Sequence, residues 1–245
     1  MSERQGSLAN KEGIHLCSQE SPTIGAYNVG GGNVQLVGIY ILTLGISLAI
    51  RAGIGISPQS SLTRTMTVIF PEFSQGTYSF LLELLMLFLA YVVMPKDFKL
   101  KYFAGLIPAL ALSLFLDLNL LITSFIKLDV YAAKVMLLVV ADAALAFGLF
   151  LMIQANLVLI PVDLFVNTLF KKTKKKWGNI KTAFDCSLLV VSACIGLIFL
   201  SEIMFIREGT IINAILVGQY IKLYTYLFKK AKTGNTFDDV NIIKK

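Results

Sequence analysis

Histidine and cysteine are scarce in this chain of 245 residues, which contains one histidine and three cysteines. The single His15 lies in a polar N-terminal segment, so a histidine-dependent protease or phosphatase in the rest of the chain would lack its base. The cysteines show no C-x-x-C spacing of a redox or metal site. We therefore expect no catalytic residue, no metal and no cofactor, and predict that the chain is not an enzyme.

Charged residues are also few, at 15% of the chain, whereas about 25% is usual in soluble domains. Hydrophobic residues make up 56%, and the mean hydropathy is +0.74. This composition excludes a soluble globular domain. The net charge of +7 resides mainly in lysines between apolar runs, a pattern that favours anionic lipids at the membrane surface rather than nucleic acid.

Six apolar runs are long enough to cross a bilayer, which requires roughly 20 residues of helix. They cover about 34–52, 76–94, 102–125, 131–155, 179–200 and 209–228. The sequence thus predicts an all-α integral membrane protein with one transmembrane bundle over 34–228. A disordered cytoplasmic tail is expected at 1–33 and a basic tail at 229–245.

Two shorter segments interrupt this pattern. Gly53, Gly55 and Pro58 predict a break after the first run, because glycine loosens a helix and proline disfavours helix in the residue before it. The following segment, 58–70, is too short and polar to span, and 161–170 after Pro161 resembles it. We expect each to be a short interfacial or re-entrant helix.

The distribution of basic residues predicts the orientation. If both tails and the connectors after the second and fourth runs are cytoplasmic, 17 of the 22 lysines and arginines lie there. The positive-inside rule then places both termini in the cytoplasm. A cluster of lysines after the second short segment would contact anionic lipids: Lys171, Lys172, Lys174, Lys175 and Lys176.

The two halves of the bundle, about 34–125 and 131–228, align at a nearly constant offset. An offset of 103 superposes Gly45 on Gly148 and Pro58 on Pro161, and an offset of 102 superposes Glu83 on Asp185. Because each half has three spans, the second half must enter the membrane in the opposite orientation. The alignment therefore predicts a 3+3 inverted repeat, an architecture that recurs in secondary transporters.

Three carboxylates lie within predicted spans, where a charge costs at least about 2.5–3.5 kcal/mol. We expect them to face the bundle interior, to pair with a cation or to be protonated, and interhelical hydrogen bonding that only locks packing is the alternative. The candidate solute or ion site combines these carboxylates with polar residues at the two breaks: Glu83, Asp142, Asp185, Ser57, Ser60 and Asp163. Asp163 could equally cap the second short helix. At the outer interface we expect Asp117 to pair with Arg51 or Arg64.

The sequence resembles a known family at several motifs. Gly53-Ile54-Gly55-Ile56-Ser57-Pro58, Ser74-Gln75-Gly76-Thr77, the segment from Phe103 to Asp117 and Pro161-Val162-Asp163-Leu164 are similar to the YitT/YczE-like small bacterial membrane proteins. The resemblance covers roughly 34–225. It implies a multi-pass protein of the bacterial inner membrane and supplies no substrate or catalytic residue.

Three functions remain open from the sequence. The first is a small secondary transporter of an unknown solute, proton-coupled through Glu83, Asp142 or Asp185. The second is a non-transporting partner or assembly factor whose small residues Gly38, Gly45 and Gly148 pack against another protein. The partner would be a different protein or, in a homodimer, a second copy of this chain. The third is a substrate-capture subunit of a multi-component importer.

Overall fold

The computed structural model describes residues 29–95, 98–155, 157–173, 177–202, 205 and 207–242. All the regular elements within these ranges are helices, and six of them are long and apolar enough to cross a membrane. The chain is therefore an all-α, multi-pass membrane protein, as its composition predicts.

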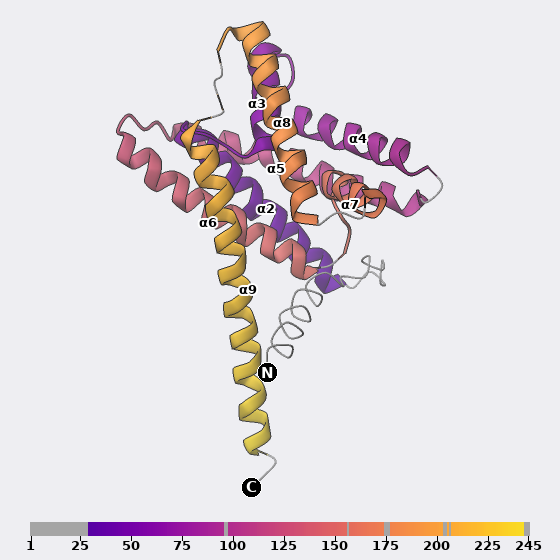
Figure 1. Cartoon of the computed structure of the whole chain (residues 1–245). Helices are drawn as coiled ribbons and strands as arrows, with labels where there is room; N and C mark the ends of the chain where they lie inside the picture. The colour runs from indigo at the N-terminus through magenta and orange to yellow at the C-terminus, as the bar shows by residue number, and fades with distance from the viewer. Residues whose placement is uncertain are drawn as a thin grey trace, which may run out of the picture.

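Within the described residues, eight α-helices and two short 3-10 segments follow one another (Figure 1). Their bounds are α2 Val29–Ala52, α3 Pro58–Ile69, α4 Gln75–Val93, η1 Leu100–Gly105, α5 Leu106–Ile122, η2 Thr123–Phe125, α6 Tyr131–Ala155, α7 Pro161–Thr173, α8 Trp177–Leu200 and α9 Glu208–Ile242. The short helices α3 and α7 are not among the candidate spans.

The first and last helices are longer than the predicted spans. Helix α2 begins at Val29, within the segment expected to be a tail, and Gly31 lies against the side chain of Leu157. Helix α9 continues to Ile242 and extends beyond the other helices in Figure 1. Residues 1–28 of the expected N-terminal tail lie outside the described residues.

Both predicted breaks are confirmed. After α2 the chain turns through Gly53 and Gly55, whose φ angles of +68° and +133° are strained for residues with a side chain. Helices α3 and α7 then begin at Pro58 and Pro161. Proline suits the first helical position because the amide hydrogen that it lacks has no partner within the helix there.

The two halves meet where α2 crosses α6. A Cβ atom added at Gly45 would lie 2.5 Å from the amide nitrogen of Leu145, and one added at Gly148 would lie 2.5 Å from that of Leu42. The offset of 103 converts one contact into the other. Glycine thus allows two backbones to touch at equivalent positions of the repeat.

Much of the remaining packing has the same reciprocity, although the contact between α4 and α5 has no counterpart of similar extent between α8 and α9. Helix α4 packs on α7 and α8 packs on α3, while α5 packs on α2 and α9 packs on α6. Exchanging the halves converts the α4–α7 contact into the α8–α3 contact, and the α5–α2 contact into the α9–α6 contact. The repeat is therefore a property of the fold and not only of the sequence.

Helices α2 and α6 run antiparallel, since Gly31 near the start of α2 meets Leu157 beyond the end of α6, and Gly45 meets Leu145. A two-fold axis that exchanges antiparallel helices runs across them. For helices that span a membrane, this axis lies near the membrane plane, which is the geometry of an inverted repeat.

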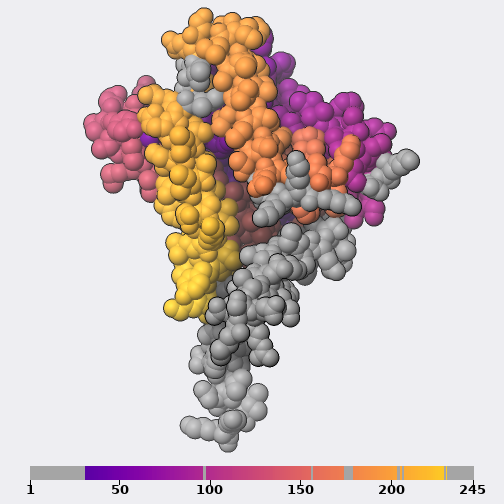
Figure 2. Space-filling model, viewed as in Figure 1, coloured from indigo at the N-terminus to yellow at the C-terminus, as the bar shows by residue number. Residues whose placement is uncertain are grey.

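The second half is more open than the first. Within the described residues, 22% of the apolar window of α8 and 6% of that of α9 are buried inside the chain, against 39–44% for the other spans. These two helices form much of the face in Figure 2, in orange and yellow. Most of their apolar side chains therefore face outward.

Candidate functional site

Glu83 of α4 lies where the two short helices meet. Its side chain is 1% exposed. Its Oε1 accepts a hydrogen bond of 2.9 Å from Nε2 of Gln59, and its Oε2 accepts one of 2.9 Å from the backbone N–H of Val162. Gln59 and Val162 are the second residues of α3 and α7 and are 103 positions apart, so the donors occupy equivalent places in the repeat.

This arrangement explains how a carboxylate can be buried here. The first turn of a helix has N–H groups without partners within the helix and a partial positive charge, and both favour an anion. Glu83 supplies the missing acceptor to α7 from a neighbouring helix. The hydrogen bonds offset part of the cost of removing the charge from water.

A buried polar stripe extends along α4 from Glu83 toward the start of the helix. Gln75, Ser79 and Glu83 are four residues apart, so they share one face of α4, and all three are buried. Gln75 donates to the hydroxyl of Thr63 on α3 over 2.9 Å. The interface between α3 and α4 is therefore polar along this stretch.

Hydroxyl groups also join α3 to α8. Ser192 of α8 lies 3.0 Å from the hydroxyl oxygen of Ser61 and 3.1 Å from that of Thr65. In the first turn of α3, the hydroxyls of Ser57 and Ser60 are 2.9 Å apart. Ser57 and Ser60 thus lie beside Gln59, as candidates for a site at the first break, although neither contacts Glu83 among the described hydrogen bonds.

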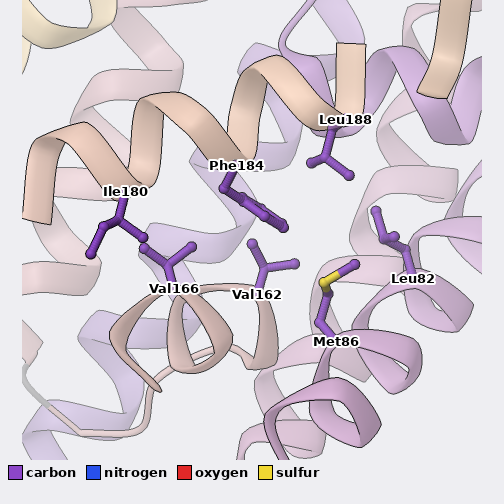
Figure 3. Close-up of a cluster of buried hydrophobic side chains, with 7 residues drawn as sticks. All are labelled: Leu82, Met86, Val162, Val166, Ile180, Phe184 and Leu188. Carbon is purple, nitrogen blue, oxygen red and sulfur yellow. The ribbon is translucent and has the colours of Figure 1, made fainter. Parts of the chain in front are cut away.

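On its other side Glu83 borders an apolar cluster. Figure 3 shows side chains of α8 facing those of α7 and α4. The cluster consists of Leu82, Met86, Val162, Val166, Ile180, Phe184 and Leu188. Glu83 therefore lies at a boundary, with hydroxyl groups on one side and tightly packed hydrocarbon on the other.

A cavity of about 290 Å³ lies beyond the apolar cluster, between α4, α7 and the connector before α5. Its lining includes Ala90 of α4, Leu159 of the second break, and the lysines Lys99, Lys101 and Lys171. Ala90 is seven residues after Glu83, or about 10 Å along the helix axis. The cavity reaches the second break, and no residue of the first break lines it.

The expected lipid-contacting lysines are only partly described. Lys171 and Lys172 are exposed near the end of α7, and Lys172 donates to the carbonyl of Val93 over 3.3 Å. Lys174, Lys175 and Lys176 lie outside the described residues.

Asp163 is half-buried in the first turn of α7. Burial raises the pKa of its carboxyl, Lys181 lowers it and Asp185 raises it. No described hydrogen bond joins Asp163 to the start of α7, where the backbone N–H of Val162 is bonded to Glu83 instead. The capping function considered for Asp163 therefore belongs to Glu83.

Asp185 does not repeat the position of Glu83, contrary to the alignment. Its Oδ1 pairs with Nζ of Lys181 one turn earlier on α8, at 3.3 Å, and its side chain is 32% exposed. A lysine on the same helix face satisfies this carboxylate locally. By the symmetry of the repeat, Asp185 would accept a hydrogen bond from Gln59, but Gln59 donates to Glu83 instead.

Asp142 is fully buried in α6, as expected for a carboxylate within a span. Its Oδ1 accepts a hydrogen bond of 2.6 Å from Asn213 of α9, and its Oδ2 has no partner among the described residues. The pair joins α9 to α6 and is separate from the Glu83 contacts.

The expected ion pair of Asp117 with Arg51 or Arg64 is wrong. Asp117 accepts hydrogen bonds from the hydroxyl of Ser74, at 2.5 Å, and from the backbone N–H of Gly76, at 2.7 Å. It thereby caps the start of α4, which satisfies its charge without an arginine. Neither arginine forms a salt bridge with a described carboxylate.

The sequence reasoning missed Gln59 and, apart from Ser60, the hydroxyl groups of α3. The available signal was composition, because the first ten residues of α3, PQSSLTRTMT, are mostly polar in an otherwise apolar chain. The contact of Glu83 with a backbone N–H had no signal, since any residue at position 162 except proline would provide that donor.

The comparisons with known proteins identify a family. Residues 33–226 match the model of DUF6198, a family of unknown function, and the chain belongs to this family. No curated protein and no solved structure shows a significant match. The resemblance to the YitT/YczE-like proteins stays a prediction.

Proposed function

We propose that this protein is a small secondary transporter in which Glu83 couples solute movement to protons. The observation that carries the proposal is the position of Glu83, whose two oxygens join equivalent positions of two short helices. Discontinuous helices that meet in this way form the substrate and ion sites of several inverted-repeat transporters.

The site is suited to both protonation states of Glu83. As a carboxylate, Glu83 accepts from Gln59 and from the backbone of Val162. When Glu83 is protonated, rotation of the Gln59 amide presents an oxygen that accepts the new O–H, while the other carboxyl oxygen still faces Val162. Protonation also removes the attraction between a negative charge and the start of α7, so it weakens the joint between α3 and α7.

Glu83 has a polar side toward α3 and an apolar side toward α8. With both termini in the cytoplasm, the orientation that we propose for a bacterial inner membrane, the hydroxyl-lined interface of α3 leads outward. The apolar cluster and the lysine-lined cavity then lie toward the cytoplasm. We infer that this conformation is closed on the cytoplasmic side, and that separation of α7 from α4 and α8 opens it.

The alternative of an assembly factor rested on small residues free to pack against another protein. Gly45 and Gly148 instead pack α2 against α6, and Gly38 lies 3.0 Å from the carbonyl of Gly148, measured from its added Cβ. These glycines are therefore occupied within the chain. A subunit of a multi-component importer remains the outcome to expect if the purified chain moves no solute.

The test is solute uptake by the purified protein in liposomes, with and without an inward proton gradient, against a panel of small anions, cations and neutral metabolites. We expect gradient-driven uptake of at least one class. Glu83→Gln should abolish the dependence on the gradient but leave insertion intact, because an amide keeps the hydrogen bonds and cannot exchange the proton.

Asp185→Asn is the matched control, since it removes an ion-paired carboxylate of another span. It should retain the dependence on the gradient. Uptake by Glu83→Gln that responds to the gradient as in the wild type would eliminate the mechanism, and absence of uptake for the whole panel would eliminate the transporter.

A further inference from the structure

The lysine-lined cavity has the charge of an anion site. Lys99, Lys101 and Lys171 contribute to its wall, together with the polar side chains of Asn167 and Thr168, and none of the described residues of its lining is acidic. None of these lysines forms a salt bridge with a described carboxylate. Three positive charges around one cavity without a negative partner favour a bound anion.

The cavity volume limits the size of the ligand. At about 290 Å³, it is at the lower end of the range for small-molecule sites. Phosphate, sulfate or a small carboxylate would fit, and lysine binds such groups through charge-assisted hydrogen bonds. The end of the cavity at Leu159 borders the break that precedes Pro161, so a ligand there lies close to the start of α7.

The inverted repeat relates this cavity to the opposite side of Glu83. The offset of 103 converts Asn167 into Arg64 and Thr168 into Thr65, so the corresponding region of the first half contains an arginine on α3. Arg64 is half-buried. Burial and the positive charge of nearby Arg51 both lower the pKa of Arg64, in that order of effect.

Among the described residues, neither arginine has an anionic partner. The Nε atoms of Arg51 and Arg64 are buried and have no hydrogen-bond partner among the described residues. Arg51 donates from Nη2 to the carbonyl of Leu120 over 2.6 Å, which leaves its charge uncompensated. Two neighbouring guanidinium groups with buried, unused donors form a second place where an anion would be stabilised.

We propose that the transported solute is a small anion, received on one side by Lys99, Lys101 and Lys171 and on the other by Arg51 and Arg64. This inference rests on the proposed function and adds the substrate class. The lysine-lined cavity reaches the second break at Leu159, and Arg51 lies in the last turn of α2, just before the first break. Both short helices begin next to Glu83. A proton on Glu83 would offset the negative charge of the solute as it passes.

The first experiment measures binding by the full chain in phosphatidylcholine nanodiscs. Inorganic phosphate and succinate are the probes, and the shift of the thermal unfolding midpoint gives the affinity. Lys99→Gln, Lys101→Gln and Lys171→Gln should each weaken binding about tenfold, which corresponds to the loss of one hydrogen bond to a charged group. Lys171→Arg, which retains the charge, should restore most of it.

Lys172→Gln is the control, because Lys172 neighbours Lys171 but does not line the cavity. Its binding should equal that of the wild type. Equal loss in Lys172→Gln, or no binding of either probe, would overturn the proposal. A second set of nanodiscs contains phosphatidylglycerol. If this lipid stabilises the protein through the three lysines and neither phosphate nor succinate does, the site holds a lipid headgroup and the solute proposal is overturned.

The second experiment compares uptake by Arg51→Gln and Arg64→Gln with uptake by Arg207→Gln. Arg207 is exposed and pairs with Glu208 at 3.8 Å, so its loss should leave anion uptake unchanged. The other two variants should raise the half-saturating anion concentration by about tenfold. Uptake of cations or neutral solutes alone would refute the anion class and leave the transport function supported. Lysine-dependent anion binding without any uptake would refute the transport function and leave only an anion-binding site.

Discussion

The glycine contact between α2 and α6 allows a quantitative test of the repeat. In Gly45→Ala the new Cβ would lie 2.5 Å from the amide nitrogen of Leu145, and in Gly148→Ala it would lie 2.5 Å from that of Leu42. Both neighbours are backbone atoms within helices and cannot rotate away. The helices must therefore separate, and a gap of about 0.5–1 Å forfeits a quarter to a half of the dispersion energy of each affected contact.

We expect each variant to lower the free energy of unfolding by about 1–3 kcal/mol, the usual cost of overpacking. Gly218→Ala on α9 is the matched control, since nothing lies within 4 Å of its added Cβ. That change should raise stability by about 0.5–1 kcal/mol, because alanine favours helix over glycine. Reversible unfolding by SDS in mixed micelles, followed by circular dichroism, gives these free energies.

The symmetry of the contact adds a second expectation. Because Gly45 and Gly148 occupy equivalent positions of one crossing, their variants should be destabilised to a similar extent. In the double variant the first methyl group has already separated the helices. The double variant should therefore lose less unfolding free energy than the sum of the two single losses. A Gly45→Ala or Gly148→Ala protein as stable as Gly218→Ala would refute the close crossing, and strictly additive effects would refute the shared contact.

Three further outcomes are expected. Asp117→Ala should lower the free energy of unfolding by about 1 kcal/mol, the cost of losing a helix cap, and a double-mutant cycle with Ser74→Ala should show coupling; purely additive losses would exclude the cap. Since burial raises the folded-state pKa of Asp163, its stabilising contribution is fully present below the unfolded-state pKa and is lost as pH rises through the folded-state value. The thermal midpoint of the wild type should fall across that window, and the fall should be smaller in Asp163→Asn; identical pH profiles would count against the shift. In a variant lacking the native cysteines, a membrane-impermeant thiol reagent applied outside intact cells should label a cysteine at Glu72 and not one at Lys171, and the reverse pattern would invert the orientation.

The helices and the two breaks were predictable from the sequence because their causes are local. Pro58 and Pro161 begin short helices, and Gly53 and Gly55 adopt positive φ angles that most other residues resist. The span boundaries follow from apolar runs that stop at prolines, glycines and lysines. The early start of α2 was not predictable, since glycine is a poor helix former and the contact of Gly31 with Leu157 is distant in sequence.

The candidate site was predictable only in part. The cost of a charge in a membrane identified Glu83 and Asp142 as buried carboxylates. It did not indicate their partners, because Gln59 and Val162 lie 24 and 79 positions from Glu83 in the chain. The alignment also implied that Asp185 would mirror Glu83, whereas Lys181, one turn away, satisfies Asp185 instead.

The most direct test of the central claim is to measure proton and solute fluxes together, in liposomes that have no initial pH difference. For the wild type, an inward gradient of the transported solute should carry protons inward and acidify the lumen, which an enclosed pH indicator records. In Glu83→Gln the same gradient should produce no acidification, while Asp185→Asn should behave like the wild type. Acidification by Glu83→Gln at the wild-type rate would contradict the claim that Glu83 carries the proton.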